Sequence, residues 1–220
     1  MDDLARRIEA DKTRELVGFV AEGKCASIAR AVVAGGNARA ILRDRDECAA
    51  LGVETGSTLL HVAVRGGFVS ASKLLISQGA DPSIADDAGM LPIHHAAAAD
   101  AFKVVEAMLD AATAVESARA PAAVVAAVTD GRVSGRTLFP RLVDPRDARG
   151  RTPVLTAAYA GEFAPVMILA EMGASLAAVD DEGRSAMAAA AEGGHTGVCE
   201  VLASMRAAQL VKSRGIRLKL

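Results

Sequence analysis

The sequence predicts an all-α solenoid, a stack of about five helix-turn-helix units, on three observations. A period of 33 residues separates Gly56 from Gly89 and again Gly150 from Gly183. Eleven residues after each of these glycines stands a residue suited to ending a helix: Gly67, Asp100, Gly161 and Gly194. Hydrophobic residues make up 51% of the chain but aromatic residues only 3%. Alanine, the best helix former, dominates, so closely packed helix pairs are expected instead of one thick core.

Each unit is expected to hold two short helices and an extended loop. In the fourth unit Thr152-Pro153 is typical of a helix start, with threonine as N-cap and proline in the first turn. Gly161 then ends the first helix in a left-handed conformation, which Asp100 can also adopt in its own unit. The second helix ends near Gly173, and a polar loop with Asp180-Asp181 follows. Such a unit cannot bury its apolar face alone, so neighbouring units must stack.

The glycine positions divide the chain into an N-terminal extension (1–11), a repeat domain (12–208) and a basic C-terminal tail (209–220). The five units span about 12–44, 56–88, 89–112, 150–182 and 183–208. Two segments fall outside the period: Arg45–Thr55, and 28 extra residues within an insertion at about 113–149. The insertion could instead hide a sixth, degenerate unit, and the sequence leaves this alternative open.

The repeated segments resemble the ankyrin-repeat family, whose 33-residue pattern contains T-P-L-H-x-A. The second unit carries Leu60-His61-Val62-Ala63 and Gly79-Ala80-Asp81, and the fourth carries Thr152-Pro153. The resemblance implies that His61 and His94 form hydrogen bonds between repeats. It also implies a ligand surface made by the concave face of the first helices and by the tips of the loops, called fingers.

Ten residues are candidates for binding a partner. By repeat position, four belong to the concave face: Arg65, His95, Tyr159 and Glu192. At or near the finger tips are Asp87, Arg151, Asp181 and Arg184. In the insertion, the combination of an aromatic residue with arginine is typical of an interface and adds Phe139 and Arg141.

We therefore expect a non-catalytic interaction module or adaptor that binds another protein, whose identity the sequence does not disclose. The alternative is a stable regulatory or assembly subunit of a larger complex. The chain alone is expected to be monomeric, with no small-molecule substrate.

A third interpretation, a nucleotide-binding enzyme, rests on the GxxxxGK string at Gly18–Lys24. A phosphate-binding loop follows a strand and continues with Ser or Thr, whereas here a helix is expected before it and Cys25 follows it. His94 and His95 are adjacent on a helix and point about 100° apart, so they do not converge on one ion. The three scattered cysteines form no CxxC pair. No catalytic residue, cofactor or metal is expected.

Charge and composition limit the expected partners and the expected cellular location. The net charge is −2, which does not favour nucleic-acid binding. The basic tail, with Lys212, Arg214, Arg217 and Lys219, is the one segment that could contact nucleic acid or a membrane surface, although neither is expected. The acidic start lacks the apolar stretch of a secretory signal, and no apolar run approaches membrane-spanning length. A cytoplasmic location is expected, with the nucleus as an alternative.

Overall fold

The computed structural model describes residues 2–101, 103–108, 110 and 143–213, and this part of the chain is all-α. Its extended pairing is confined to two isolated antiparallel bridges, Ile41 with Thr58 and Val179 with Ser185. The helices are α1 (Asp2–Ala21), α2 (Cys25–Val33), α3 (Arg45–Leu51), α4 (Leu59–Arg65), α5 (Val69–Ser77), α6 (Pro92–Ala98), α11 (Pro153–Ala160), α12 (Phe163–Glu171), α13 (Ala186–Glu192) and α14 (Thr196–Ser213). Residues 103–108 are also helical. The predicted fold class is confirmed.

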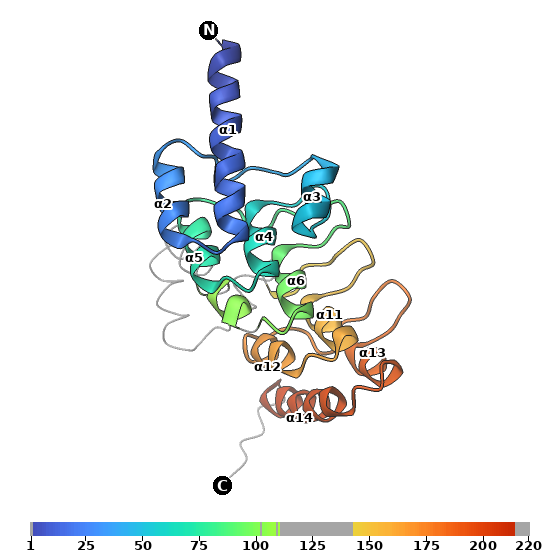
Figure 1. Cartoon of the computed structure of the whole chain (residues 1–220). Helices are drawn as coiled ribbons and strands as arrows, with labels where there is room; N and C mark the ends of the chain where they lie inside the picture. Colours follow the sequence, from blue (N-terminus) through green and yellow to red (C-terminus); the bar gives the residue numbers. More distant parts are fainter. Residues whose placement is uncertain (1, 102, 109, 111–142, 214–220) are drawn as a thin grey trace.

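The helices stack in one dimension. The first helices α4, α6, α11 and α13 follow one another down the stack, and each packs against the next (Figure 1). Their partners α5, α12 and α14 lie on the other side from the loops that project between units (Figure 1). The first unit is the pair α1 and α2, in which α1 packs against α4.

Alanine makes this close stacking possible. The same position of each of the last four units, seven residues after its opening glycine, is a fully buried alanine: Ala63, Ala96, Ala157 and Ala190. A methyl group there lets neighbouring first helices approach closely, whereas a longer side chain would push them apart. In the first unit, at the end of the stack, the corresponding residue is the half-buried Phe19. This repeated alanine is therefore one reason why the chain buries few aromatic residues.

The local helix signals act as the sequence predicts. The Thr152 side chain accepts a hydrogen bond from the amide of Leu155, and Pro153 occupies the first turn of α11. Gly161 ends that helix with a φ of 81°. Asp100 takes the same left-handed role in its own unit with a φ of 48°, the one positive φ of a non-glycine residue in the described segments.

The helices also extend across the boundaries drawn from the repeat. The first helix begins at Asp2 and crosses the limit between residues 11 and 12, and α14 continues to Ser213, beyond residue 208. The extra segment after the first unit contains α3. Asp44 caps this helix by accepting from the amides of Asp46 and Glu47, and Gly52 ends it with a φ of 66°.

The insertion does not separate the third unit from the fourth, because α6 packs directly against α11. The described end of the insertion, residues 143–149, includes the buried Val143 and leads into the finger of the fourth unit. Its backbone at Ala148 lies against Gly89 of the preceding finger. No further unit is therefore stacked between α6 and α11, and residues 111–142 lie outside the described part of the chain.

The glycine between the two helices of a unit also accommodates a ring from the next unit. The Phe68 ring covers Gly23 of the first unit, and the His195 ring covers Gly161 of the fourth. A Cβ atom at Gly161 would lie 2.5 Å from His195 Nδ1. The equivalent Gly194 has a similar φ of 73°, but a Cβ atom added there would meet no other atom within 4 Å.

These two glycines give a matched test of the packing. We expect Gly194→Ala to lower the free energy of unfolding by about 1 kcal/mol, through left-handed strain alone. Gly161→Ala should cost about 2–3 kcal/mol, because the His195 ring must also move. Urea denaturation of both variants measures the difference. Repeating Gly161→Ala in a His195→Ala background should remove the excess, and an unchanged excess would refute the contact.

Candidate functional site

Two buried histidines join consecutive units. His61 Nδ1 accepts from the amide of Thr58 in its own helix start, and Nε2 lies 3.1 Å from the Met90 carbonyl oxygen of the next unit. His94 repeats the arrangement, accepting from the Leu91 amide and reaching the Arg151 carbonyl oxygen at 3.1 Å. Because an amide can only donate, each Nδ1 is unprotonated and each Nε2–H is the donor to the carbonyl. The two rings are therefore neutral bridges between units.

The protonation equilibrium of these rings follows from that geometry. Burial lowers the pKa of His61 to about 4, although its bond to the Met90 carbonyl opposes the shift. Burial likewise lowers the pKa of His94. A second proton would place a charge in the interior and remove the acceptor that the amide needs.

The fingers that lead into the third, fourth and fifth units are each closed by a buried aspartate at the base: Asp86, Asp147 and Asp180. In every case Oδ1 accepts from two amides of the same hairpin, those two and four residues further on. These bonds fix the finger and hold one carboxylate oxygen. The other oxygen, Oδ2, has partners that differ from finger to finger: a side chain of a first helix at Asp86 and Asp180, and an arginine of the finger at Asp147 and Asp180.

Tyr159 belongs to the finger base of the last two units. Its hydroxyl donates to Asp180 Oδ2 at 2.7 Å, and Arg184 Nε donates to the same oxygen at 3.0 Å. The guanidinium carbon of Arg184 lies 5.1 Å from the Tyr159 ring centroid, and that of Arg151 lies 6.0 Å from it. Arg151 is itself paired with Asp147 at 2.7 Å. The tyrosine and two arginines thus form one locked platform.

The charges of this platform support one another. Burial alone would raise the pKa of Asp180, but hydrogen bonds from Tyr159 and Arg184 outweigh it and lower the pKa to about 2. Burial and the bond to Asp180 raise the pKa of Tyr159 to about 12. Burial also raises the pKa of Asp147, but the hydrogen bonds from Arg151 and Arg149 outweigh it and hold the pKa below its usual value. These two aspartates stay charged and the tyrosine stays a donor near neutral pH.

The remaining predicted residues are more dispersed. Arg65, at the end of α4, is exposed and its guanidinium lies against Gly52 at the end of α3. Asp87 is exposed and accepts from the Thr55 hydroxyl, while its amide donates to the Thr55 carbonyl. The amide of Asp181 donates to the Arg149 carbonyl, and the Asp181 and Glu192 side chains are exposed. Phe139 and Arg141 lie outside the described residues.

His95 and His94 diverge, as their adjacency predicts. His94 points into the fourth unit, whereas His95 Nε2 lies 2.8 Å from Asp86 Oδ2. The His95 ring meets His61 edge-on, with the centroids 5.5 Å apart. The sequence reasoning missed this cluster because it compared adjacent histidines and not histidines of consecutive units.

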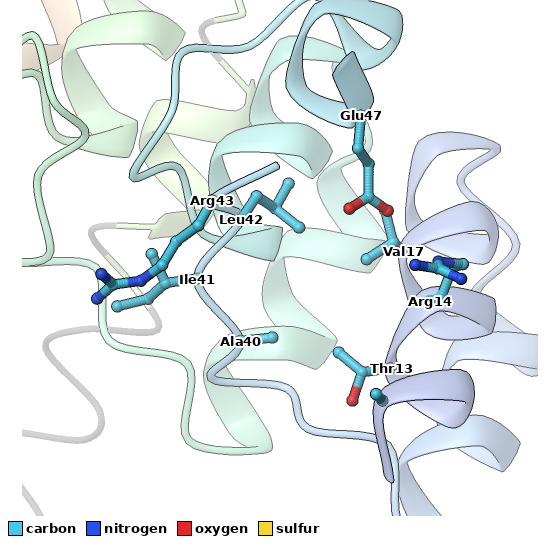
Figure 2. Close-up of a pocket in the computed structure, with 9 residues that line it drawn as sticks. Thr13, Arg14, Val17, Ala40, Ile41, Leu42, Arg43 and Glu47 are labelled. Atoms are coloured by element: carbon cyan, nitrogen blue, oxygen red, sulfur yellow. The ribbon is translucent and has the colours of Figure 1, made fainter. Parts of the chain in front are cut away.

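A cavity of about 390 Å³ lies between α1, residues 40–43 and α3 (Figure 2). Apolar groups of Val17, Ala40 and Leu42 line it, and Arg14 and Glu47 stand at its wall. None of these residues was predicted to be functional. The eleven extra residues Arg45–Thr55 were the available signal, because α3 forms one side of the cavity.

Comparison with known proteins bears on the repeat itself. A family profile described as ankyrin repeats (3 copies) matches residues 19–118 and 126–213, most of the chain. This chain belongs to the ankyrin-repeat family. Ankyrin repeats generally mediate protein–protein interaction, and the family is typically non-catalytic.

The similar proteins are much longer than this chain. Neurogenic locus notch homolog protein 2 of Homo sapiens is 32% identical over 133 residues, which cover 60% of this chain and 4% of that protein. The neurogenic locus Notch protein of Drosophila melanogaster is 43% identical over 56 residues, 26% of this chain and 2% of that protein. The probable palmitoyltransferase AKR2 of Saccharomyces uvarum is 40% identical over 63 residues, 28% of this chain and 9% of that protein.

The GxxxxGK string forms the turn between the two helices of the first ankyrin unit. Its first four residues are the last turn of α1, so no strand precedes the string. Gly23 has a φ of 67° under the Phe68 ring, and Lys24 is paired with Glu22 at 2.5 Å. This geometry gives the string a structural role. Over the described residues, no helix has both the length and the apolar character needed to cross a membrane.

The histidine bridges predict how stability depends on pH. Unfolded His61 titrates near pH 6.5 and folded His61 near 4, so the unfolded chain binds more protons between these values. The free energy of unfolding should be level above about pH 6.5 and fall by about 3 kcal/mol from His61 alone as the pH approaches 4. His94 adds to the loss in the same direction.

Urea denaturation between about pH 7 and pH 4 measures this loss, and NMR titration of the four histidines assigns it. His61 should remain neutral until about pH 4. A free energy of unfolding that does not change over this interval, or a His61 ring that titrates near its ordinary value, would contradict the bridge.

Proposed function

We propose that this chain is a non-catalytic adaptor that binds another protein through the concave face of its first helices, the fingers and the insertion. One observation carries the proposal: a buried position of the first helices holds the same small residue in four units, whereas a position at the helix end, which the repeat assigns to the concave face, holds a different residue in each. Seven residues after the opening glycine the residue is alanine in each of the last four units. Two residues further on the residues are Arg65, Ala98, Tyr159 and Glu192. Stacking does not require this variety, whereas recognition of a partner does.

The order of this face favours binding. Tyr159, Arg151 and Arg184 are held by the finger aspartates, so little side-chain freedom is lost when a partner contacts them. Arg65, Asp87, Asp181 and Glu192 are exposed and supply charges at both ends of the face. In this proposal the platform is a rigid anchor and the exposed charges select the partner.

We extend the proposal to Phe139 and Arg141 of the insertion, on their composition alone, and to a cytoplasmic location. A stable subunit differs from a transient adaptor in one measurable property. It co-purifies with its partner at a fixed stoichiometry, whereas a transient adaptor is recovered in variable amounts and needs cross-linking.

Charge reversals on the two sides of the stack test the proposed face. Affinity purification with cross-linking first identifies the partner, whose affinity for each variant is then measured. Arg65→Glu on α4 and Asp181→Lys in the finger should each weaken binding about tenfold or more. Their matched controls are Lys73→Glu on α5 and Glu171→Lys on α12, exposed residues of second helices that make the same charge changes.

The controls should bind as the original chain does, and circular dichroism should report the same helical content for all four variants. Equal loss in the test and control variants, or no loss in either, would refute the concave assignment. Phe139→Ala combined with Arg141→Glu tests the insertion separately.

A further inference from the structure

The three finger aspartates have equivalent backbone hydrogen bonds, but only two of them are paired with an arginine. Asp147 Oδ2 is paired with Arg151, and Asp180 Oδ2 with Arg184. Both arginines follow the opening glycine of their unit directly. In the third unit that position is Met90, which carries no charge. The Asp86 side chain is nevertheless 0% exposed, as is that of Asp147. A buried carboxylate here lacks the fixed countercharge that its two equivalents have.

His95 takes the place of the missing arginine. It stands six residues after Gly89, where the fourth unit has Thr156 and the fifth has Ala189. Its Nε2 lies 2.8 Å from Asp86 Oδ2, and 19% of its side chain is exposed. An imidazole gives the carboxylate a hydrogen bond but, unlike arginine, carries no permanent charge, so a bound cation would add the countercharge that the two equivalent sites already hold.

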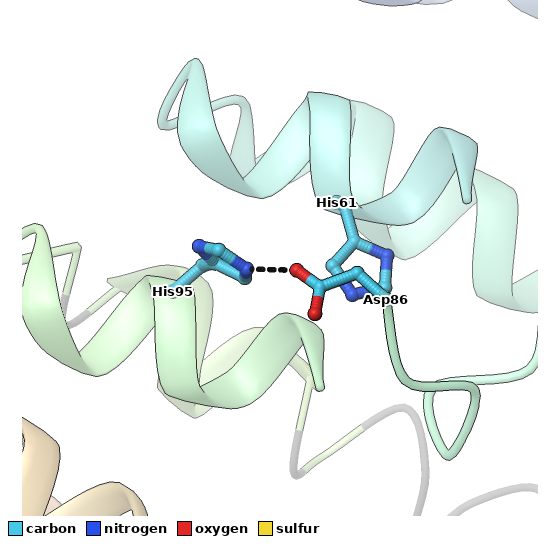
Figure 3. A group of neighbouring side chains, drawn as sticks. All are labelled: His61, Asp86 and His95. Carbon is cyan, nitrogen blue, oxygen red and sulfur yellow. Dashed lines mark hydrogen bonds and ion pairs between the residues drawn. The ribbon is translucent and has the colours of Figure 1, made fainter. Parts of the chain in front are cut away.

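A second imidazole faces the same carboxylate from the preceding unit. Figure 3 shows the His61 and His95 rings on two helices with the Asp86 carboxylate between them, and one ligand atom from each residue lies within 4.8 Å of the others. Two imidazole nitrogens and one carboxylate oxygen are the donors that zinc and similar divalent transition metals prefer. Asp86 Oδ1 keeps its two amide bonds and fixes the carboxylate in place.

We propose that Asp86, His95 and His61 bind one divalent transition-metal ion of the zinc type at the interface of the second and third units. On binding, the proton of each imidazole moves from Nε2 to Nδ1, so both rings remain neutral. The Thr58 hydroxyl, 3.0 Å from His61 Nδ1, accepts the new N–H. A hydroxyl or carbonyl in this outer position is the usual partner of a metal-bound histidine.

The ion competes with the bridge between units. His61 gives up its bond to the Met90 carbonyl, and the Thr58 amide loses its acceptor. The affinity is therefore lower than that of a dedicated structural zinc site. Metal binding does not depend on the proposed adaptor function, and either can fail alone.

The test uses the full chain without an affinity tag. Isothermal titration with Zn²⁺ should give one equivalent, and Mg²⁺, which prefers oxygen ligands, should give none. Two variants probe separate parts of the argument. His95→Ala removes a partly exposed ligand, and Met90→Arg installs the arginine that the equivalent units carry. Each should weaken Zn²⁺ binding about tenfold or more. His195→Ala, remote from the cluster, is the matched control and should bind as the original chain does.

The four histidines also report the site by NMR. Zn²⁺ should shift the Nε2 resonances of His61 and His95 while His94 keeps its Nε2–H and His195 is unchanged. Absence of binding, or binding that Met90→Arg and His95→Ala leave intact, would overturn the proposal. Binding that shifts only His195, or that generates the thiolate absorption of a Co²⁺–cysteine complex, would overturn it as well.

Discussion

The centre of the stack depends on a neutral imidazole placed across each of two consecutive boundaries between units, from the second to the fourth. His61 and His94 each accept a hydrogen bond from a backbone amide at the start of their own helix. Each also donates one to a backbone carbonyl of the next unit. One side chain thus satisfies two backbone groups and fixes the distance between first helices. The buried alanines set how close those helices come, and the imidazoles set their register. The bond from His94 to Arg151 has a further consequence, because it joins the third and fourth units across the insertion.

With the units in register, the fingers and the concave face follow. Each finger aspartate closes its own hairpin with one oxygen, and Asp86 and Asp180 reach a first helix with the other. At the last two units the second oxygen organises Tyr159, Arg151 and Arg184 into a platform. At the third unit the same oxygen meets His95, and the arginine is missing. The same finger aspartate therefore holds a rigid platform of arginines and tyrosine at the last two units and pairs with a histidine at the third.

The sequence determines the repeat because its signals are local and periodic. Gly161, Thr152 and the buried alanines could be interpreted from spacing alone, as could the left-handed Asp100. Other features depend on contacts between units and were not predictable. The role of Asp86 is set by Met90 and His95, which lie in the next unit. Its clustering with His61 appears only when the two units are stacked against each other. The helix α3 had a local signal, the cap at Asp44 followed by Gly52, but the repeat period assigned those residues no place. The sequence predicted which residues belong to the candidate face. It did not predict that the finger aspartates hold the side chains of Tyr159, Arg151 and Arg184 in place.

The bond between His94 and Arg151 can be observed directly. A long-range ¹H–¹⁵N spectrum near neutral pH reports the tautomer of His94, and a nuclear Overhauser experiment reports what lies beside its Nε2–H. A neutral ring protonated at Nε2, with a slowly exchanging proton close to the Arg151 backbone, is the result that direct stacking of α6 on α11 requires. A His94 ring that exchanges freely with water, or one with no Overhauser contact to Arg151 and Thr152, would contradict a continuous solenoid across the insertion.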